Sequence, residues 1–184
     1  MSKTYVFFAE GFEEVEALTV VDLLRRAEIE TSMVSITGEQ TVTGAHGITI
    51  MMDALLDEIN MGQADALILP GGMPGTRNLQ KCERLVNGLV EADKAGKLVC
   101  AICAAPLVLG QNHILKGKTA CCYPSFEEEL FEANVSFEPV CHDGNVITSR
   151  GMGTAIAFAG EIIATLVSKD KEKEITDSIL YSVH

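Results

Sequence analysis

The sequence contains no tryptophan, and aromatic residues make up only 5% of its 184 residues, whereas hydrophobic residues make up 47%. The core must therefore be built from aliphatic side chains, as in α/β folds rich in Val, Ile, Leu and Ala. This length does not demand a second core, so we expect residues 1–184 to form a single domain.

Basic residues are also scarce. The chain has 14 Lys and Arg but 26 Asp and Glu, so its net charge is -12. This acidity argues against nucleic acid or an anionic membrane as a partner. The chain shows neither a secretion signal at Met1 nor an apolar run of transmembrane length. We therefore expect a soluble, cytoplasmic protein with no membrane contact.

Metal-binding and disulfide patterns are missing as well. The six cysteines lack the paired spacing of metal ligands, and several lie in apolar runs, which is typical of reduced thiols in a cytosol. Cys141 and His142 are adjacent and would point to opposite sides of a strand. His46 lies in a hairpin loop that could reach the edge of a site, but no metal and no cofactor is expected.

Several short apolar runs predict buried strands, and they alternate with segments of helical periodicity. Such alternation predicts a doubly wound, mostly parallel sheet with helices on both faces. The predicted strands are 4–9, 31–36, 64–69, 98–102 and 118–122, with antiparallel hairpins at 41–43/48–52 and 135–140/145–149, the second turning at Asp143-Gly144. The predicted helices are 13–26, 53–59, 78–85, 89–95, 104–111, a turn at 126–130, 154–167 capped by Thr154, and 175–183.

The strand at 98–102 ends abruptly at Cys103, which stands between small residues in the pattern Ala101-Ile-Cys-Ala-Ala105. This spacing is that of a nucleophile elbow, a tight strand-to-helix turn that exposes a reactive side chain. The helix predicted from Ala104 would lower the pKa of the Cys103 thiol. A buried cysteine acting as a small hydrophobe is the alternative, and it is the role we assign to Cys100.

Two further features follow strands whose carboxyl ends should lie at the same edge of the sheet. Glu16 follows the first strand, and Gly71-Gly72 follows the strand at 64–69. Ligands of such sheets bind outside these strand ends. Taken alone, Glu16 could be an ordinary solvated carboxylate of a first helical turn. Its expected convergence with Cys103 favours a functional site.

Four short motifs in order resemble the ThiJ/PfpI family, and most closely the branch that contains the parkinsonism-associated deglycase and bacterial ThiJ-like proteins. They are Glu13-Glu-Val-Glu16, Leu69-Pro-Gly-Gly72, Ala101-Ile-Cys-Ala-Ala-Pro106 and Thr148-Ser-Arg-Gly-Met-Gly-Thr154. The resemblance implies a flavodoxin-like three-layer sandwich of the class I glutamine amidotransferase type, usually a homodimer. It also implies cofactor-free glyoxalase or deglycase chemistry on dicarbonyls, oxidation sensing or chaperone behaviour.

On this resemblance Cys103 is the nucleophile and Glu16 its carboxyl partner, while the backbone N–H groups of Gly72 and Ala104 form an oxyanion hole and Gly71 lies with them in the binding site. Arg25 or Arg26, whichever faces the partner subunit, and the Ser149-Arg150 loop would line the site or the interface. Tyr123 would contribute to the binding of the substrate.

Two residues depart from relatives. Tyr123 stands before Pro124 where many members have histidine, and Ala104 follows the cysteine where the protease-like branch has histidine. The second departure disfavours a protease.

Two functions remain open at this point. The first is an enzyme acting on aldehydes or dicarbonyls through Cys103, and the second is a redox sensor or chaperone using the same thiol. A homodimer is also expected because the helix after Glu16 carries Val20, Leu23 and Leu24 toward what would be an unburied face.

Overall fold

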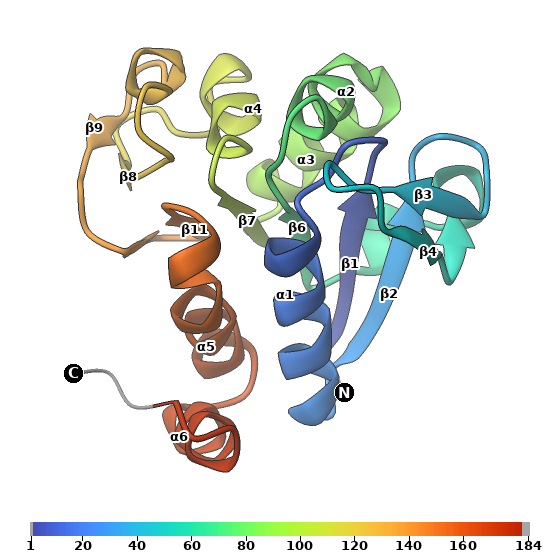
Figure 1. Cartoon of the computed structure of the whole chain (residues 1–184). Coiled ribbons are helices and arrows are strands. Elements are labelled where there is room, and N and C mark those ends of the chain that lie inside the picture. Colours follow the sequence, from blue (N-terminus) through green and yellow to red (C-terminus); the bar gives the residue numbers. More distant parts are fainter. Residues whose placement is uncertain (1, 182–184) are drawn as a thin grey trace.

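The computed structural model describes residues 2–181, whose main feature is a seven-stranded sheet between two layers of helices (Figure 1). The strand order is β10-β11-β7-β6-β1-β2-β5, and every neighbouring pair except β10 and β11 is parallel. The strands of this sheet are β1 Lys3–Phe8, β2 Glu30–Ser35, β5 Ala54–Leu55, β6 Ala66–Leu69, β7 Leu98–Ile102, β10 Val140–Asp143 and β11 Val146–Ser149. The predicted sheet is confirmed.

The helices form two groups on opposite faces of the sheet. One face packs against α1 Glu14–Arg26, α5 Ala155–Leu166 and α6 Lys169–Ser178. The other packs against α2 Gly75–Lys81, α3 Glu83–Lys94 and α4 Pro106–Gln111. Strands β6 and β7 are buried along their whole length because helices cover both of their faces, which explains why they read as continuous apolar runs.

Short elements complete the described chain. Strands β3 Thr41–Thr43 and β4 Thr49–Met51 form the first predicted hairpin, and β8 Thr119–Ala120 pairs in parallel with β9 Asn134–Val135. Single 3-10 turns occupy Leu56–Glu58 (η1), Met61–Gln63 (η2), Glu127–Glu129 (η3) and Met152–Thr154 (η4). No helix among residues 2–181 is both long and apolar enough to cross a membrane.

Several predicted helices differ from the observed ones. Residues 53–59 do not form a helix, because the Asp53 carboxylate accepts hydrogen bonds from the Met33 N–H (2.7 Å) and from Arg25 (2.6 Å) and holds the chain against β2 as β5. The helices predicted at 78–85 and 89–95 are instead α2 and α3, which are separated at Cys82. Helix α3 continues through Gly88, where the absence of a side chain leaves room for Met61.

The last helix begins at Lys169 instead of Ile175, since Ser168 caps it by accepting the Lys171 N–H at 3.1 Å. The predicted end at Val183 lies outside the described residues.

The second hairpin and the cap of α5 also need correction. The hairpin begins at Val140, because residues 134–135 pair with β8 instead. Thr154 does not cap α5 with its side chain; its hydroxyl lies 2.6 Å from the Ser149 hydroxyl and donates to the Gly151 carbonyl. The turn η4 just before α5 explains this, since it directs Thr154 back toward the loop after β11.

The apolar face predicted to remain open on α1 is closed within the chain. Val20, Leu23 and Leu24 are all buried, because α1 packs on the sheet and against α5, which lies beside it (Figure 1). The sequence argument for a dimer from these three side chains was therefore wrong.

Candidate functional site

Cys103 lies immediately after β7, in the predicted turn. Its φ angle is +65°, a left-handed conformation that non-glycine residues rarely adopt. Its N–H donates to the Ser149 carbonyl at 2.9 Å, and its carbonyl accepts the Tyr123 N–H at 2.8 Å. These bonds hold the strained residue in place, as a nucleophile elbow requires. However, α4 begins only at Pro106, so the sulfur does not lie directly at a helix N-terminus as predicted.

Glu16 lies in the first turn of α1 and is only 1% exposed. Its Oε2 accepts the Gly71 N–H at 3.0 Å, and its carboxyl group shares a hydrogen bond with the Cys103 thiol. The ends of β1, β6 and β7 thus bring together Glu16, Gly71 and Cys103, which lie far apart in the sequence. This convergence is the arrangement that the strand order predicts at the switch point of a doubly wound sheet.

Glycine is required at positions 71 and 72 for different reasons. A Cβ on Gly71 would lie 2.6 Å from both the Cys103 Cβ and the Glu16 Oε2. Gly72 has φ +92°, and a Cβ there would lie 2.3 Å from the backbone nitrogen of Glu13. The absent side chains let the backbone approach the thiol, whose anion is stabilised by the N–H groups of Ala104 and Gly72.

The thiol and the carboxyl group hold one proton between them. Burial raises the pKa of Glu16 to about 7, although hydrogen bonds from Cys103 and Gly71 lower this pKa in part. Burial, followed by the charge of Glu16, raises the pKa of the Cys103 thiol to about 12, so the prediction that this pKa is lowered was wrong. Each anion disfavours the other, so between about pH 7 and pH 12 the site carries one negative charge, which lies mainly on the Glu16 carboxylate beside the protonated thiol.

Tyr123 and Arg150 lie beside this pair, at a shallow pocket of about 540 Å³. Gly151 separates the pocket from the carboxyl group, since a Cβ there would lie 3.3 Å from the Tyr123 ring and 3.9 Å from the Glu16 Oε1. Arg150 donates to the carbonyls of Cys122 and Phe137, each at 3.3 Å. The sequence predicted these two residues at the site but not the contribution of the Phe137 ring.

Arg25 and Arg26 are not part of this site in the described chain. They close α1 at the end opposite Glu16. The Arg25 guanidinium donates to the Thr31 carbonyl and to Asp53, and Arg26 pairs with Asp22 at 2.6 Å. The prediction that one of them lines the site has no support within a single chain.

His46 reaches the neighbourhood of the site but binds Glu14 instead of Cys103. The buried Glu14 carboxylate accepts the backbone N–H of His46 at 2.7 Å and lies 2.9 Å from its Nδ1, which ties the hairpin loop to the start of α1. With Glu13, these residues form a group that could offer three ligands to a metal ion. Glu14 already uses both oxygens to hold the hairpin, so the arrangement has a structural explanation.

The residues that the sequence analysis missed are Gly151, Phe137 and Met152, which shape the pocket beside the pair. Gly151 was visible within the quoted motif at 148–154, but its contact with Tyr123 depends on the fold. Phe137 was assigned to a strand, although two thirds of its surface is exposed. No sequence signal distinguishes such a side chain from a core residue.

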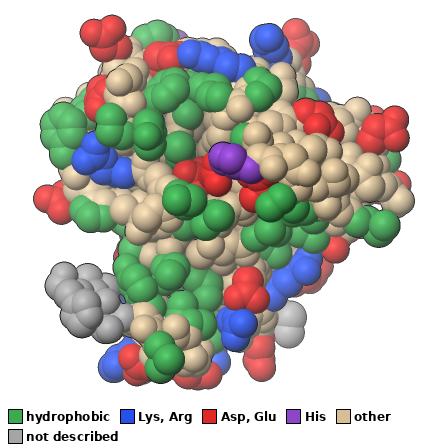
Figure 2. Space-filling view, viewed as in Figure 1, with side chains coloured by type: hydrophobic (Ala, Val, Ile, Leu, Met, Phe, Trp, Pro, Cys, Tyr) green, Lys and Arg blue, Asp and Glu red, His purple; other side chains and the backbone are tan. Residues whose placement is uncertain are grey.

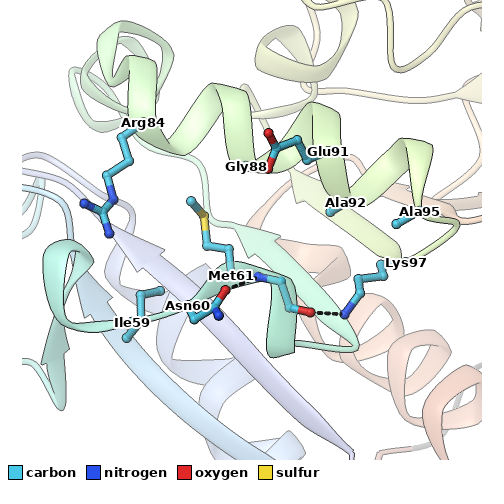
Figure 3. Close-up of a pocket in the computed structure, with 10 residues that line it drawn as sticks. Ile59, Asn60, Met61, Arg84, Gly88, Glu91, Ala92, Ala95 and Lys97 are labelled. Carbon is cyan, nitrogen blue, oxygen red and sulfur yellow. Dashed lines mark hydrogen bonds between the residues drawn. The ribbon is translucent and has the colours of Figure 1, made fainter.

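A second pocket, of about 480 Å³, lies between η2 and α3 (Figure 3). It is found at the amino ends of β6 and β7, opposite the edge that carries Cys103. Lys97 donates there to the carbonyls of Gly62 and Ala64, and Arg84 pairs with Asp57. Its two cations are therefore engaged, and no thiol lines it.

Fold and site together define an α/β protein with a strained cysteine elbow and a buried carboxyl partner. The DJ-1/PfpI family model matches residues 2–165, and this chain belongs to that family, as the resemblance to ThiJ/PfpI proteins predicted. The Drosophila melanogaster protein dj-1beta is 35% identical over 183 residues, which cover 98% of each chain. A deglycase from Pyrococcus abyssi is 30% identical, over 89% of this chain and 99% of its own.

A longer relative, Arabidopsis thaliana protein DJ-1 homolog B, is 36% identical over 97% of this chain, but this chain spans only 41% of its length. Among solved structures, the C103A mutant of a Salmonella typhimurium DJ-1 superfamily protein superposes with a TM-score of 0.95 at 33% identity, covering 100% of both chains. The flavodoxin-like α/β fold is thus confirmed.

Cys103 is expected to be the most reactive of the six thiols at neutral pH. It is partly exposed and lies beside the Glu16 carboxylate, which can take up its proton, whereas Cys100, Cys121, Cys122 and Cys141 are buried. Limiting iodoacetamide followed by peptide mapping should label Cys103 first. Faster labelling of Cys82, the other partly exposed thiol, or of Cys141 would contradict the elbow interpretation.

Proposed function

We propose that this protein is a cofactor-free glyoxalase or deglycase that acts on reactive dicarbonyls or their adducts through Cys103 and Glu16. The observation that supports this most directly is the hydrogen bond between the buried Glu16 carboxyl group and the thiol at the strained elbow. A nucleophile and a proton carrier with a pKa of about 7 are the two groups that such chemistry requires. The Pyrococcus abyssi relative is named a deglycase, which agrees with this class of activity.

In the first step the Cys103 sulfur attacks the aldehyde carbon of a dicarbonyl such as methylglyoxal. The Glu16 carboxylate takes the proton of the thiol, the new S–C bond forms as the carbonyl π electrons move to oxygen, and Glu16 passes that proton to the oxygen to give a hemithioacetal. The N–H groups of Gly72 and Ala104 approach the sulfur and are the donors available to the developing negative oxygen.

In the second step the Glu16 carboxylate removes the proton from the former aldehyde carbon and returns it to the neighbouring carbon through an enediol. The product is a thioester of a hydroxy acid. Water attacks the thioester, the S–C bond breaks, and the thiol is regenerated with release of lactate. No outside electron donor is needed, because one carbon is oxidised as its neighbour is reduced.

The pocket beside Gly151 would receive the part of the substrate that does not react. Tyr123, Phe137 and Met152 present apolar surface there, and Arg150 lies next to the Phe137 ring at 5.5 Å. A dicarbonyl attached to a larger group could therefore be accommodated.

The experiment that tests this proposal follows methylglyoxal consumption and lactate formation by the purified protein. Wild type should convert methylglyoxal to lactate, and Cys103→Ser should not. Cys82→Ser is the matched control, because it removes the other partly exposed thiol without touching the site, and it should retain full activity. Absence of lactate with wild type would contradict the proposal.

The same thiol would also suit an oxidative-stress sensor or a redox-dependent chaperone. The specific observation in favour is that Cys103 is partly exposed at a strained turn, where an oxidant can reach its sulfur. A protein that forms no lactate, while peroxide converts Cys103 selectively to a sulfinic acid, would fit this second function. Either role suits the cytoplasm, where thiols stay reduced.

We also propose that the protein is a homodimer, but on the basis of exposed residues other than Val20, Leu23 and Leu24. Val15 on α1 is 48% exposed, Ile48 is 53% exposed and Met51 on β4 is 69% exposed. Hydrophobic side chains extend over the middle of the face that carries α1, β3 and β4 (Figure 2). Light scattering at micromolar protein should give twice the 19.8 kDa of one chain. Val15→Asp should shift the protein toward the monomer, and a wild-type mass of one chain would reject the dimer.

A further inference from the structure

Two buried thiols that the proposed reaction does not use face one another at the edge of the sheet. Cys121 follows β8 and Cys141 lies on β10, the outermost strand. Cys121 is fully buried and Cys141 is 7% exposed. Cys141 is among the groups that raise the pKa of the Cys121 thiol, so the two side chains are neighbours.

Thr148 on β11 fixes the positions of both cysteines. Its hydroxyl accepts the Cys121 N–H at 3.0 Å and lies 3.7 Å from the Cys121 sulfur. Cys141 is directly opposite Thr148 in the antiparallel pair, so these two side chains share one face of the sheet. The Cys121 sulfur is therefore held on the same face as the Cys141 side chain, with Thr148 as a common neighbour.

We propose that Cys121 and Cys141 are a redox modification site that a hydroperoxide converts to an intrachain disulfide. One sulfur attacks a peroxide oxygen, the O–O bond breaks, and a sulfenic acid and water result. The second thiol attacks the sulfenic sulfur, the S–O bond breaks, the S–S bond forms, and a second water leaves. Two thiols are oxidised as one peroxide is reduced, which balances the reaction.

Burial makes this pair slower to oxidise than Cys103. Peroxide reaches the partly exposed Cys103 directly, whereas Cys121 and Cys141 are both buried. The pair lies between an edge strand and the two-residue strand β8, where local opening needs the loss of few hydrogen bonds. We therefore expect the disulfide to form at peroxide exposures beyond those that oxidise Cys103.

The link would act on the chain segment beside the proposed active site. Cys121 is two residues before Tyr123, whose N–H binds the Cys103 carbonyl. A disulfide would tie this segment to β10 and restrict its motion. The inference does not depend on the proposed function, because it concerns two thiols outside that site.

The test treats the folded protein with hydrogen peroxide, alkylates the remaining thiols after denaturation, and maps peptides without reduction. Trypsin alone leaves all three cysteines of this region in the fragment 119–150, so a glutamate-specific protease is added to separate 119–127 from 133–150. We expect these two fragments to be joined, with the loss of two hydrogens and an alkyl group on Cys122. Dithiothreitol should separate them.

Cys122→Ser is the matched control, since Cys122 is an adjacent buried thiol, and it should keep the link. Cys121→Ser should abolish it. Fragmentation of the wild-type linked peptide locates the alkylated thiol and gives the same answer if a variant fails to fold. Three alkylated thiols after exhaustive peroxide treatment, or a link through Cys122, would overturn the proposal.

Discussion

Glu16→Gln is expected to lower methylglyoxal turnover by about a hundredfold to ten-thousandfold, the usual contribution of a positioned acid–base group. Glutamine keeps the shape of the side chain and can still accept the Gly71 N–H, but it cannot carry a proton between carbons. Glu16 is the group in contact with the thiol whose pKa, about 7, allows both donation and removal of a proton at neutral pH. The loss should appear in kcat with little change in the fold.

Tyr123→Phe is the companion variant, because Tyr123 replaces the histidine of many relatives. Its ring lies beside Gly151 at the pocket and half of its surface is exposed. A tyrosine hydroxyl donates a hydrogen bond but is a poor base at neutral pH, so the expected loss is about tenfold or less.

Measurement of kcat and KM for both variants separates these roles. Equal and severe losses would identify Tyr123 as a catalytic acid. Full activity of Glu16→Gln would remove the carboxyl–thiol mechanism, and it would do so even if Cys103→Ser proved inactive.

The contribution of Glu16 to the free energy of unfolding is expected to fall by roughly 3 kcal/mol between about pH 4.5 and pH 7, at about 1.4 kcal/mol for each unit of pKa shift. The pKa of Glu16 is 4.5 in an unfolded chain and about 7 in the folded one, so the folded state binds the proton more tightly. This stabilisation is complete below pH 4.5 and is lost as the pH rises through 7. The group is mostly buried, and solvent screening reduces the effect little.

Urea unfolding of wild type and Glu16→Gln across this range measures the effect. The difference in stability should move in favour of the variant as the pH rises, because glutamine does not ionise. Glu14→Gln is the matched contrast on the same helix turn. Burial alone would raise the pKa of Glu14, but hydrogen bonds from His46 and from backbone N–H groups lower it, so its contribution appears above pH 4.5 and is lost in acid. Parallel pH dependence in the two variants would contradict the assignment of the buried proton to Glu16.

The sequence by itself determined the parts of this protein that depend on local pattern. Strand β7 was predicted with its observed ends, because a strand buried on both faces must be apolar throughout and must stop where the chain turns. The elbow at Cys103 followed from the small residues around it, and the meeting of Glu16, Gly71 and Cys103 followed from the rule that parallel strands end at one edge.

Only the tertiary structure decided features that depend on partners distant in the chain. The sequence predicted that Val20 and Leu23 are exposed on α1, but packing against α5 buries both side chains. Residues 53–59 were predicted to form a helix, but hydrogen bonds from Met33 and Arg25 to Asp53 hold this segment as a strand. The elevated pKa of Glu16 likewise comes from burial beneath the glycine loop, which no local pattern encodes. Periodicity and turn chemistry act over a few residues, whereas Cys121 and Cys141 become neighbours only because the fold brings both of them to Thr148.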